Sequence, residues 1–265
     1  MSRPVALVTG ASSGIGREFA KVFAAHGHDL VLVARRERKL EALAAEILAD
    51  QGDACTVDVI AVDLGKAKGP KRLVAELRDR GIAVDALVNN AGLADSGNFA
   101  EMSAARALDI VNLNVRALTE LSLALLPDMV ERGRGRILNV ASIVAFQPVP
   151  SMAVYSASKA YVLSLTESLS EELKHTGVTV SALCPGLTKT EMTEDIDMAA
   201  EVPELFVGQA RDVAEQGYRA CMRGEVIAIP GLLNQAFVGW TQTQPRWSYR
   251  LLSGLAARFS QGGRP

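Results

Sequence analysis

The amino-acid sequence predicts an α/β fold: a single Rossmann-type doubly wound domain of about seven parallel strands, with helices on both faces of the sheet. Three observations support this fold class. Short apolar segments alternate with longer segments that carry apolar residues at helical spacing, as in LEALAAEIL at 40–48. The short segments are continuously apolar, which is typical of strands buried on both faces of a parallel sheet. A glycine-rich turn, TGASSGIG at 9–16, directly follows the first of them.

The expected elements follow one another along most of the chain. The first strand leads into the glycine-rich turn, and REFAKVFAAHG at 17–27 follows as a helical segment. Strands are expected at residues 5–8, 30–34, 57–62, 86–89, 137–141, 178–183 and 226–229. We expect residues 1–230 to form the dinucleotide-binding and catalytic domain, with a substrate loop at 190–210. Residues 231–265 are expected to form a basic, helical C-terminal extension.

Composition and charge narrow the class of protein. The chain has 265 residues, 49% of them hydrophobic and 22% charged, and a formal net charge of -2, so no nucleic-acid partner is expected. Cys55, Cys184 and Cys221 fit neither a disulfide framework nor a metal pattern, and the three histidines are dispersed, so we expect no metal site and a reducing compartment. With no secretory signal pattern and no apolar segment of membrane-spanning length, the expected location is cytoplasmic.

The glycine-rich turn is a candidate phosphate site. In a doubly wound sheet, ligands bind outside the carboxyl ends of the strands, and the first strand-to-helix turn is a favoured position. A helix that starts near Gly14 would direct free N–H groups at an anion. Gly10, Gly14 and Gly16 would let a ligand approach the backbone closely, although a plain tight turn would also explain them.

The end of the second strand indicates which dinucleotide is bound. An NAD site usually places a carboxylate there to hold the ribose 2′-hydroxyl, whereas this chain has Ala34 and Arg35, followed by Arg36. A guanidinium reads phosphate well, so we expect NADP(H), with NAD(H) as the alternative. A solvated helix start would also account for the arginines.

A second set of residues indicates acid–base chemistry. Tyr155 and Lys159 are four residues apart and therefore share one face of a helix. A nearby ammonium group, together with a positive nicotinamide ring, would favour the phenolate and lower the tyrosine pKa toward neutrality. Ser142 follows an apolar strand at its carboxyl end, where its hydroxyl could hold a substrate carbonyl oxygen.

Six motifs, in order and at matching spacing, resemble the short-chain dehydrogenase/reductase family. They are TGASSGIG, NNAG at 89–92, Asn114 in NLNV, Ser142, Tyr155-x-x-x-Lys159 and Pro185-Gly186. The strand end VLVARR and the IPG after the last strand look more like the NADP-preferring bacterial oxidoreductase branch than like acyl-carrier-protein reductases.

The resemblance implies four catalytic roles. Tyr155 would donate the proton in carbonyl reduction and accept it in the reverse direction. Lys159 would lower the tyrosine pKa and hold the nicotinamide ribose, and Ser142 would orient the carbonyl. Asn114 would kink a long helix and hold a water that links Lys159 to solvent.

The resemblance also implies a set of cofactor contacts. Asp63 would accept a hydrogen bond from the adenine amino group, and Ser13 stands where many NADP-preferring relatives have a basic residue. The expected cofactor-binding residues are Gly10, Ser12, Ser13, Gly14, Ile15, Gly16, Arg35, Asp63, Leu64, Asn89, Ala91, Gly92, Tyr155, Lys159, Pro185, Gly186 and Thr188.

The predicted protein is therefore an NADP(H)-dependent oxidoreductase that interconverts a ketone or aldehyde and the corresponding alcohol. The alternatives are an NAD-linked alcohol dehydrogenase of the same fold and a non-catalytic cofactor-binding sensor. We expect a medium-sized, fairly hydrophobic substrate and a homodimer or homotetramer. Trp247, Leu251, Leu255 and Phe259 form a narrow apolar stripe beside arginines, which predicts a tail helix that docks on protein or contacts a membrane surface.

Overall fold

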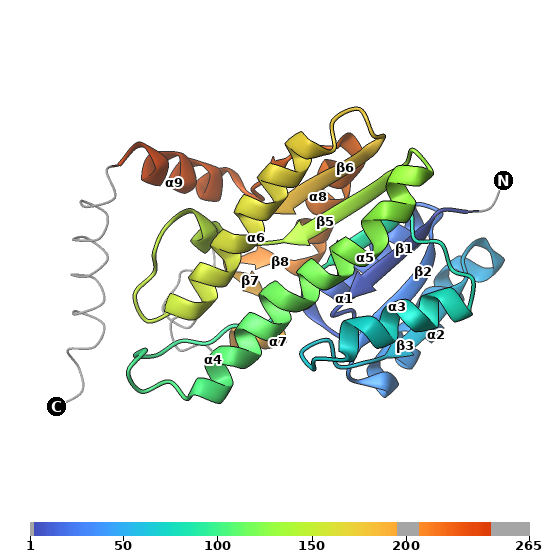
Figure 1. Ribbon diagram of the computed structural model, residues 1–265, viewed down its shortest axis with the longest axis horizontal. Coiled ribbons are helices and arrows are strands. Elements are labelled where there is room, and N and C mark those ends of the chain that lie inside the picture. Colours follow the sequence, from blue (N-terminus) through green and yellow to red (C-terminus); the bar gives the residue numbers. More distant parts are fainter. Residues whose placement is uncertain (1–2, 195–206, 245–265) are drawn as a thin grey trace.

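The computed structural model describes residues 3–194 and 207–244 and contains one seven-stranded parallel sheet with strand order β3-β2-β1-β4-β5-β6-β9 (Figure 1). Every expected strand is confirmed, with small differences at the ends. The strands are β1 (Val5–Thr9), β2 (Asp29–Ala34), β3 (Val57–Ala61), β4 (Ala86–Asn89), β5 (Gly135–Val140), β6 (Val178–Leu183) and β9 (Ile227–Ala228). The chain order reverses between β1 and β4, which are neighbours in the sheet. Ligands of doubly wound sheets bind at such a reversal.

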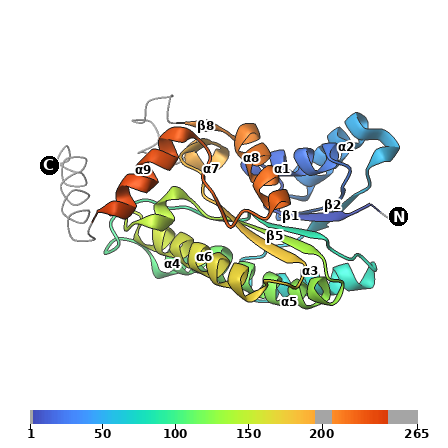
Figure 2. The same cartoon turned by 90° about the horizontal axis from the view of Figure 1, so that it is seen from above.

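Helices cover both faces of the sheet, as expected (Figure 2). One face packs against α1 (Gly14–Ala25), α2 (Glu37–Gln51) and α8 (Ala210–Arg223). The other packs against α3 (Gly69–Asp79), α5 (Leu118–Glu131) and α6 (Ala153–Glu172). An apolar core results on each side of the strands, and a third, smaller cluster packs around α6 and the ends of β5 and β6. Strands between two such cores must be apolar along their whole length, which explains the continuous apolar segments.

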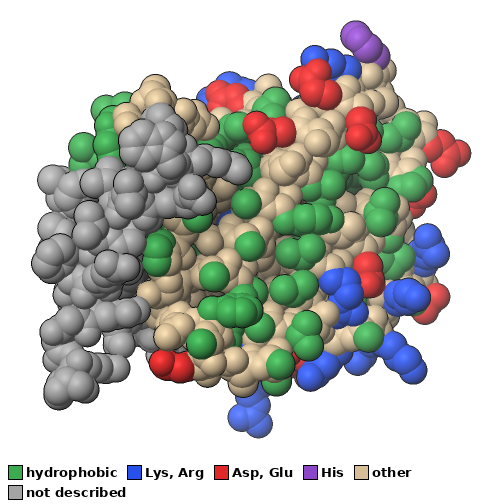
Figure 3. All heavy atoms as spheres, turned by 60° about the vertical axis from the view of Figure 1, so that its left-hand side comes forward, with side chains coloured by type: hydrophobic (Ala, Val, Ile, Leu, Met, Phe, Trp, Pro, Cys, Tyr) green, Lys and Arg blue, Asp and Glu red, His purple; other side chains and the backbone are tan. Residues whose placement is uncertain are grey.

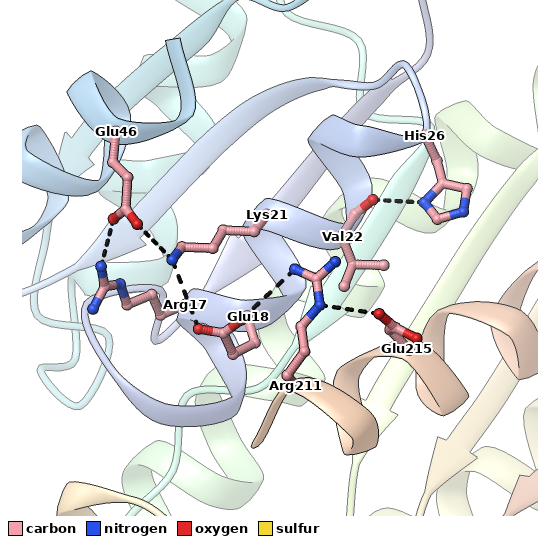
Figure 4. A network of polar contacts seen from close by, with 8 residues as sticks. All are labelled: Arg17, Glu18, Lys21, Val22, His26, Glu46, Arg211 and Glu215. Atoms are coloured by element: carbon pink, nitrogen blue, oxygen red, sulfur yellow. Dashed lines mark hydrogen bonds and ion pairs between the residues drawn. The ribbon is translucent and has the colours of Figure 1, made fainter. Parts of the chain in front are cut away.

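Helix α1 carries the glycine-rich turn at its start, and its position is set mainly by apolar packing. Phe19 and Phe23 are fully buried, and a Cβ atom on Gly217 of α8 would lie 2.7 Å from the Phe19 ring. Ion pairs add orientation: Lys21 contacts Glu46 of α2 at 2.6 Å, and Arg211 of α8 contacts Glu18 at 3.7 Å (Figure 4). Exposed pairs of this kind contribute about 0–1 kcal/mol each, so burial of the phenylalanines dominates.

One long helical stretch is interrupted at the position predicted for a kink. Helix α4 (Ala104–Val111) continues into the π-helical segment η2 (Asn112–Ala117), which leads directly into α5. Such π-helical turns are rare and are frequent at functional sites. Asn114 lies within this segment, where the widened turn allows its side chain to reach the loop that starts at Leu93.

The region after β6 contains a short helix, as expected for the substrate loop, and a pair of short strands that the sequence did not predict. A second small sheet pairs β7 (Thr188–Lys189) with β8 (Gly208–Gln209), and the short helix α7 (Glu191–Glu194) follows β7. These elements begin and end the expected substrate loop at 190–210. The middle of that loop lies outside the described residues.

The expected C-terminal extension begins as a helix, α9 (Leu232–Thr243). Its side chains Val238 and Thr241 are buried, and the helix packs near the 3-10 turn η3 (Ile143–Phe146) that follows β5. The predicted apolar stripe at 247–259 lies outside the described residues. Within residues 3–194 and 207–244, no helix combines the length and apolar character needed to cross a bilayer.

Candidate active site

A cleft of about 390 Å³ opens at the carboxyl ends of β1, β2, β3 and β4. Nine of the expected cofactor residues line it: Gly10, Ser12, Ser13, Ile15, Arg35, Asp63, Leu64, Ala91 and Gly92. They come from four separate strand-to-helix connections, which the parallel sheet brings to one edge. Residues of α7 and the loop before it close one side of the same cleft.

The glycine-rich turn has the conformation that its glycines allow. Gly10 has φ +68° and Gly14 has φ +55°, values that favour glycine. Helix α1 starts at Gly14, and the first backbone bond back into the turn runs from the Arg17 N–H to the Ser13 carbonyl. The N–H groups before Arg17 therefore have no helical partner and are available to an anion at the positive end of the helix.

Gly16 has a packing role rather than a place in the cleft lining. A Cβ atom there would lie 2.4 Å from both the Gly10 carbonyl oxygen and the Asn90 side-chain nitrogen. The absence of a side chain at Gly16 therefore lets helix α1 approach the end of β1.

Two arginines after β2 differ in what they contact. Arg36 donates to the Ser12 hydroxyl at 2.9 Å and the Ser13 hydroxyl at 2.8 Å, and it pairs with Glu191 at 2.7 Å. Arg35 lines the cleft and is exposed, and within the described parts of the chain it forms neither a hydrogen bond nor an ion pair. Its guanidinium is thus available to a bound anion.

The first asparagine of the NNAG motif does not lie where it was expected. Asn89 does not line the cleft: its side chain is only 4% exposed and donates to Asn139 at 2.9 Å and to Ser122 at 3.2 Å. Asn139 in turn donates to Thr166 of α6, so this buried network connects β4, β5, α5 and α6. Successive strand residues point to opposite faces, and the last residue of β4 points into the core.

Asn90 takes the place in the cleft that was expected for Asn89. Its side-chain amide donates to the Thr9 carbonyl at 2.9 Å, and the Thr9 hydroxyl accepts from the Asn90 and Ala91 N–H groups. These bonds join the ends of β1 and β4, where the sheet order reverses. The doubled asparagine was the only signal in the sequence, and it did not distinguish the two positions.

Ser142, Tyr155 and Lys159 come together beside the cleft. Ser142 follows β5 and caps η3, and its hydroxyl shares a hydrogen bond with the Tyr155 hydroxyl. Lys159 lies one helical turn after Tyr155 in α6, with Nζ 5.7 Å from the centre of the tyrosine ring. Lys159 also donates to the Val140 carbonyl at 2.7 Å, which leaves two of its three ammonium hydrogens for other partners.

Burial shifts the pKa of both titratable groups. Desolvation lowers the pKa of Lys159 from 10.5 to about 8. It also raises the pKa of Tyr155, and the Ser142 hydrogen bond acts in the opposite direction. The sequence predicted a lowered tyrosine pKa from the lysine ammonium together with a bound, positive nicotinamide ring, whereas in the free protein removal of the phenolate from water dominates and raises the pKa. Tyr155 is therefore a phenol at neutral pH and can donate a proton.

Asn114 connects the candidate catalytic residues to the cleft. Its side chain is buried, accepts from the Leu93 N–H at 2.8 Å, and donates to the Leu93 carbonyl at 2.9 Å and to Ser158 at 3.0 Å. A Cβ atom on Gly92 would lie 3.3 Å from Asn114 Oδ1 and 3.6 Å from Lys159 Nζ. Lys159 and Asn114 thus face the same bare backbone of the cleft wall.

The three expected cofactor residues directly after β6, Pro185, Gly186 and Thr188, lie next to this group but do not line the cleft. The Ser142 hydroxyl is 3.4 Å from the Pro185 carbonyl, and Thr188 is buried, with its hydroxyl donating to the Gly186 carbonyl at 3.1 Å. A Cβ atom on Gly186 would lie 2.6 Å from the Asn234 side chain, so α9 begins against this turn. Gly186 is therefore needed for packing of the C-terminal helix.

The residues present fit a nicotinamide dinucleotide. The free N–H groups of α1 suit a pyrophosphate, and the side-chain-free walls at Gly10 and Gly92 allow close approach. Asp63 lies at the far end of the cleft, beyond β3. Lys159, Tyr155 and Ser142 lie at the opposite end, next to Gly92. Nucleotide-binding and proton-transferring groups thus occupy the two ends of one site.

Comparison with known proteins identifies the family. The sequence model of the short chain dehydrogenase family matches residues 4–201. This chain belongs to that family and is an oxidoreductase acting on CH–OH or C=O groups.

Relatives and solved structures agree with this assignment. The chain is 34% identical over 256 residues to very-long-chain 3-oxoacyl-CoA reductase of Phaeosphaeria nodorum. The matched region covers 96% of this chain and 71% of that protein. A short-chain dehydrogenase from Sphingobium yanoikuyae in complex with NADPH is 35% identical, with a TM-score of 0.80, covering 92% of this chain and 97% of its own. One from Burkholderia phymatum in complex with NAD is 28% identical, with a TM-score of 0.77, covering 89% and 92%. The two structures support a nicotinamide cofactor.

Proposed function

We propose that this protein is an NADP(H)-dependent oxidoreductase that interconverts a ketone or aldehyde and the corresponding alcohol, with Tyr155 as the general acid and base. The observation that carries the proposal is the cluster of Ser142, Tyr155 and Lys159 beside the cleft at the carboxyl ends of the strands. A non-catalytic sensor would have no need for a hydrogen-bonded serine–tyrosine pair next to a desolvated lysine.

The side chains divide the proton chemistry among them. The bound nicotinamide supplies or takes the hydride. In reduction, the Tyr155 phenol donates its proton to the carbonyl oxygen, and the Ser142 hydroxyl donates a hydrogen bond to the same oxygen. The Lys159 ammonium stabilises the phenolate left behind and holds ribose hydroxyls with its remaining hydrogens. Asn114 fixes the loop at Leu93 and, through Ser158, the helix that carries Tyr155.

Replacing Tyr155 by Phe tests this assignment. The ring still packs, so dinucleotide binding is expected to stay within a fewfold of the wild type, while turnover falls about 10²–10⁴-fold because the transferable proton is gone. The measurement is NADPH oxidation with a panel of carbonyl compounds, together with calorimetric titration of NADPH. Turnover within a fewfold of the wild type would remove Tyr155 from the mechanism.

Preference for NADP(H) is proposed to depend on Arg35, with help from Arg36. The Arg35 guanidinium, which has no ion-pair partner among the described residues, would contact the 2′-phosphate at the cleft, and Ala34 offers no carboxylate for an NAD ribose. Arg35→Ala is expected to weaken NADPH binding by about 1.5–3 kcal/mol and NADH binding far less. Titration calorimetry with both dinucleotides measures this difference, and equal losses would favour the alternative, an NAD-linked alcohol dehydrogenase.

We propose a medium-sized, fairly hydrophobic carbonyl or alcohol substrate. Ile143, Val144 and Phe146 follow Ser142 directly and are half-buried, so apolar surface borders the reacting groups. The name of the Phaeosphaeria nodorum relative, a reductase of very-long-chain 3-oxoacyl-CoA, is consistent with an apolar ketone.

A further inference from the structure

Glu191, at the start of α7, holds two cations that border the cofactor cleft. Its two carboxylate oxygens are both used: Oε2 lies 2.7 Å from Arg36, and Oε1 lies 2.5 Å from Lys39 of α2. The contact spans 155 positions in sequence, between the start of the substrate loop and the end of the second strand. All three side chains are partly exposed, and Arg36 and Glu191 both line the cleft.

The Arg36 guanidinium, together with two neighbouring hydroxyl groups, provides most of the donors of an anion site. Arg36 donates to the hydroxyls of Ser12 and Ser13, which belong to the glycine-rich turn, so its position is fixed beside the phosphate-binding helix terminus. Hydroxyl groups and a guanidinium are donors that a phosphate monoester accepts. In this structure, the anion that completes the group is the carboxylate of Glu191.

The start of α7 also lies across the glycine-rich turn. A Cβ atom on Gly14 would be 2.9 Å from the Thr190 methyl group, so the residue before Glu191 contacts the first residue of α1. The Glu191 ion pairs therefore hold this segment over the turn. A second anion at Arg36 would be repelled by the carboxylate, whose pKa the two cations lower to about 2, so that it stays charged at neutral pH.

We propose that Glu191 is a specificity-determining residue that competes with the 2′-phosphate of NADP(H) for Arg36 and Lys39. This inference rests on the proposed NADP(H) dependence. Binding of a 2′-phosphorylated nucleotide displaces the carboxylate and detaches the start of α7 from α2. NAD(H), which has a hydroxyl at that position, leaves the ion pairs in place. Glu191 thus reduces the preference for NADP(H) that Arg35 and Arg36 create.

The test compares adenosine 2′,5′-bisphosphate with adenosine 5′-phosphate, which differ only in the 2′-phosphate. Titration calorimetry is run on the full-length wild type and on the variants Glu191→Gln and Glu37→Gln. Glu37 is exposed and lies beside Arg36, so its variant controls for the loss of one negative charge. Glu191→Gln is expected to tighten the bisphosphate about three- to tenfold and leave the monophosphate unchanged. Glu37→Gln is expected to change either ligand less than twofold.

Other outcomes distinguish this proposal from the proposed function. Unchanged or weaker bisphosphate binding in Glu191→Gln, or equal changes for both ligands, would overturn the competition while leaving the dehydrogenase assignment intact. An equal gain in Glu37→Gln would show a general charge effect and overturn it as well. Wild-type protein that binds neither NADPH nor NADH in the same calorimeter would instead overturn the proposed function.

Discussion

Lys159 shows how the surroundings of a single residue set its chemistry. Its side chain is only 6% exposed, and burial lowers its pKa to about 8. Tyr155, one turn earlier, is shifted in the opposite sense, because desolvation disfavours the charged form of each group. Below pH 8, the free protein therefore holds an ammonium beside a phenol, which is the pair that the proposed mechanism of carbonyl reduction uses.

The pH dependence of the reduction rate is expected to follow the protonation state of Lys159. As pH rises through about 8, Lys159 loses its proton while Tyr155 keeps its own, so kcat/KM for reduction should fall with an apparent pKa near 8. Lys159→Arg keeps the charge at higher pH and should move this fall upward. Initial rates of reduction between about pH 6 and 10, measured for the wild type and for Lys159→Arg, give the apparent pKa of this fall in each protein. A wild-type decline that begins only near the usual tyrosine pKa of about 10 would assign the limit to Tyr155 instead.

At the scale of single elements, the position of α1 depends on close backbone contact. Gly16 lies in the first turn of this helix, where any Cβ atom would meet the Gly10 carbonyl and the Asn90 side chain at 2.4 Å. The contact brings the N–H groups of the helix to the end of β1. Helix dipole and free donors act only over short distances, so a small shift of α1 would weaken the phosphate site.

Gly16→Ala is expected to lower the free energy of unfolding by about 1–3 kcal/mol, because the methyl group overpacks the turn. Dinucleotide affinity should fall as well, since the helix start must move. Gly239→Ala is the matched control: this glycine lies in α9, and the added Cβ would meet no atom of another element within 4 Å among residues 3–194 and 207–244, so the change should be neutral or slightly stabilising. Urea denaturation and NADPH titration of both variants measure the difference. Equal stability of the two variants would contradict the packing role of Gly16.

At the scale of the molecule, one side carries exposed apolar residues on α4, α5 and α6 (Figure 3). Leu108 is 59% exposed and Leu123 is 69% exposed. Val111, Val115, Thr119 and Leu123 recur every four residues along α4, η2 and α5, and Thr119 contacts the exposed Tyr161 of α6 at 3.0 Å. We define the α4–α6 face by the residues Leu108, Val111, Val115, Thr119, Leu123 and Tyr161. We propose that two copies of the chain meet at this face. Clustered apolar exposure of this kind marks interaction surfaces.

Charged substitutions on the α4–α6 face are expected to reduce the assembly to monomers. Leu108→Glu together with Leu123→Glu would place carboxylates in an apolar contact, where their desolvation is costly. Leu232→Glu on α9, an even more exposed leucine outside this face, should leave the mass unchanged. Light scattering coupled to size-exclusion chromatography measures the mass of each variant. A wild-type monomer, or an unchanged mass in the double variant, would remove the α4–α6 face as the contact.

Local patterns in the sequence were sufficient for the strands, the glycine-rich turn and the pairing of Tyr155 with Lys159. Each depends on residues a few positions apart, whose geometry the backbone dictates: continuous apolar character in a buried strand, φ freedom at glycine, and four-residue spacing on a helix. The expectation of a kink at Asn114 came from the resemblance to known dehydrogenases, and the structure places the π-helical segment η2 at that position.

Contacts between distant parts of the chain decided which side chains reach the cleft and how their pKa values shift. Strand direction and register assign Asn89 to the core and Asn90 to the cleft, although the two are neighbours and identical in type. The parallel sheet brings Glu191 to Arg36, and burial, rather than residue type, lowers the pKa of Lys159 and raises that of Tyr155. Side-chain direction, long-range ion pairs and desolvation are properties of the packed molecule, since each depends on which residues the fold places around a group.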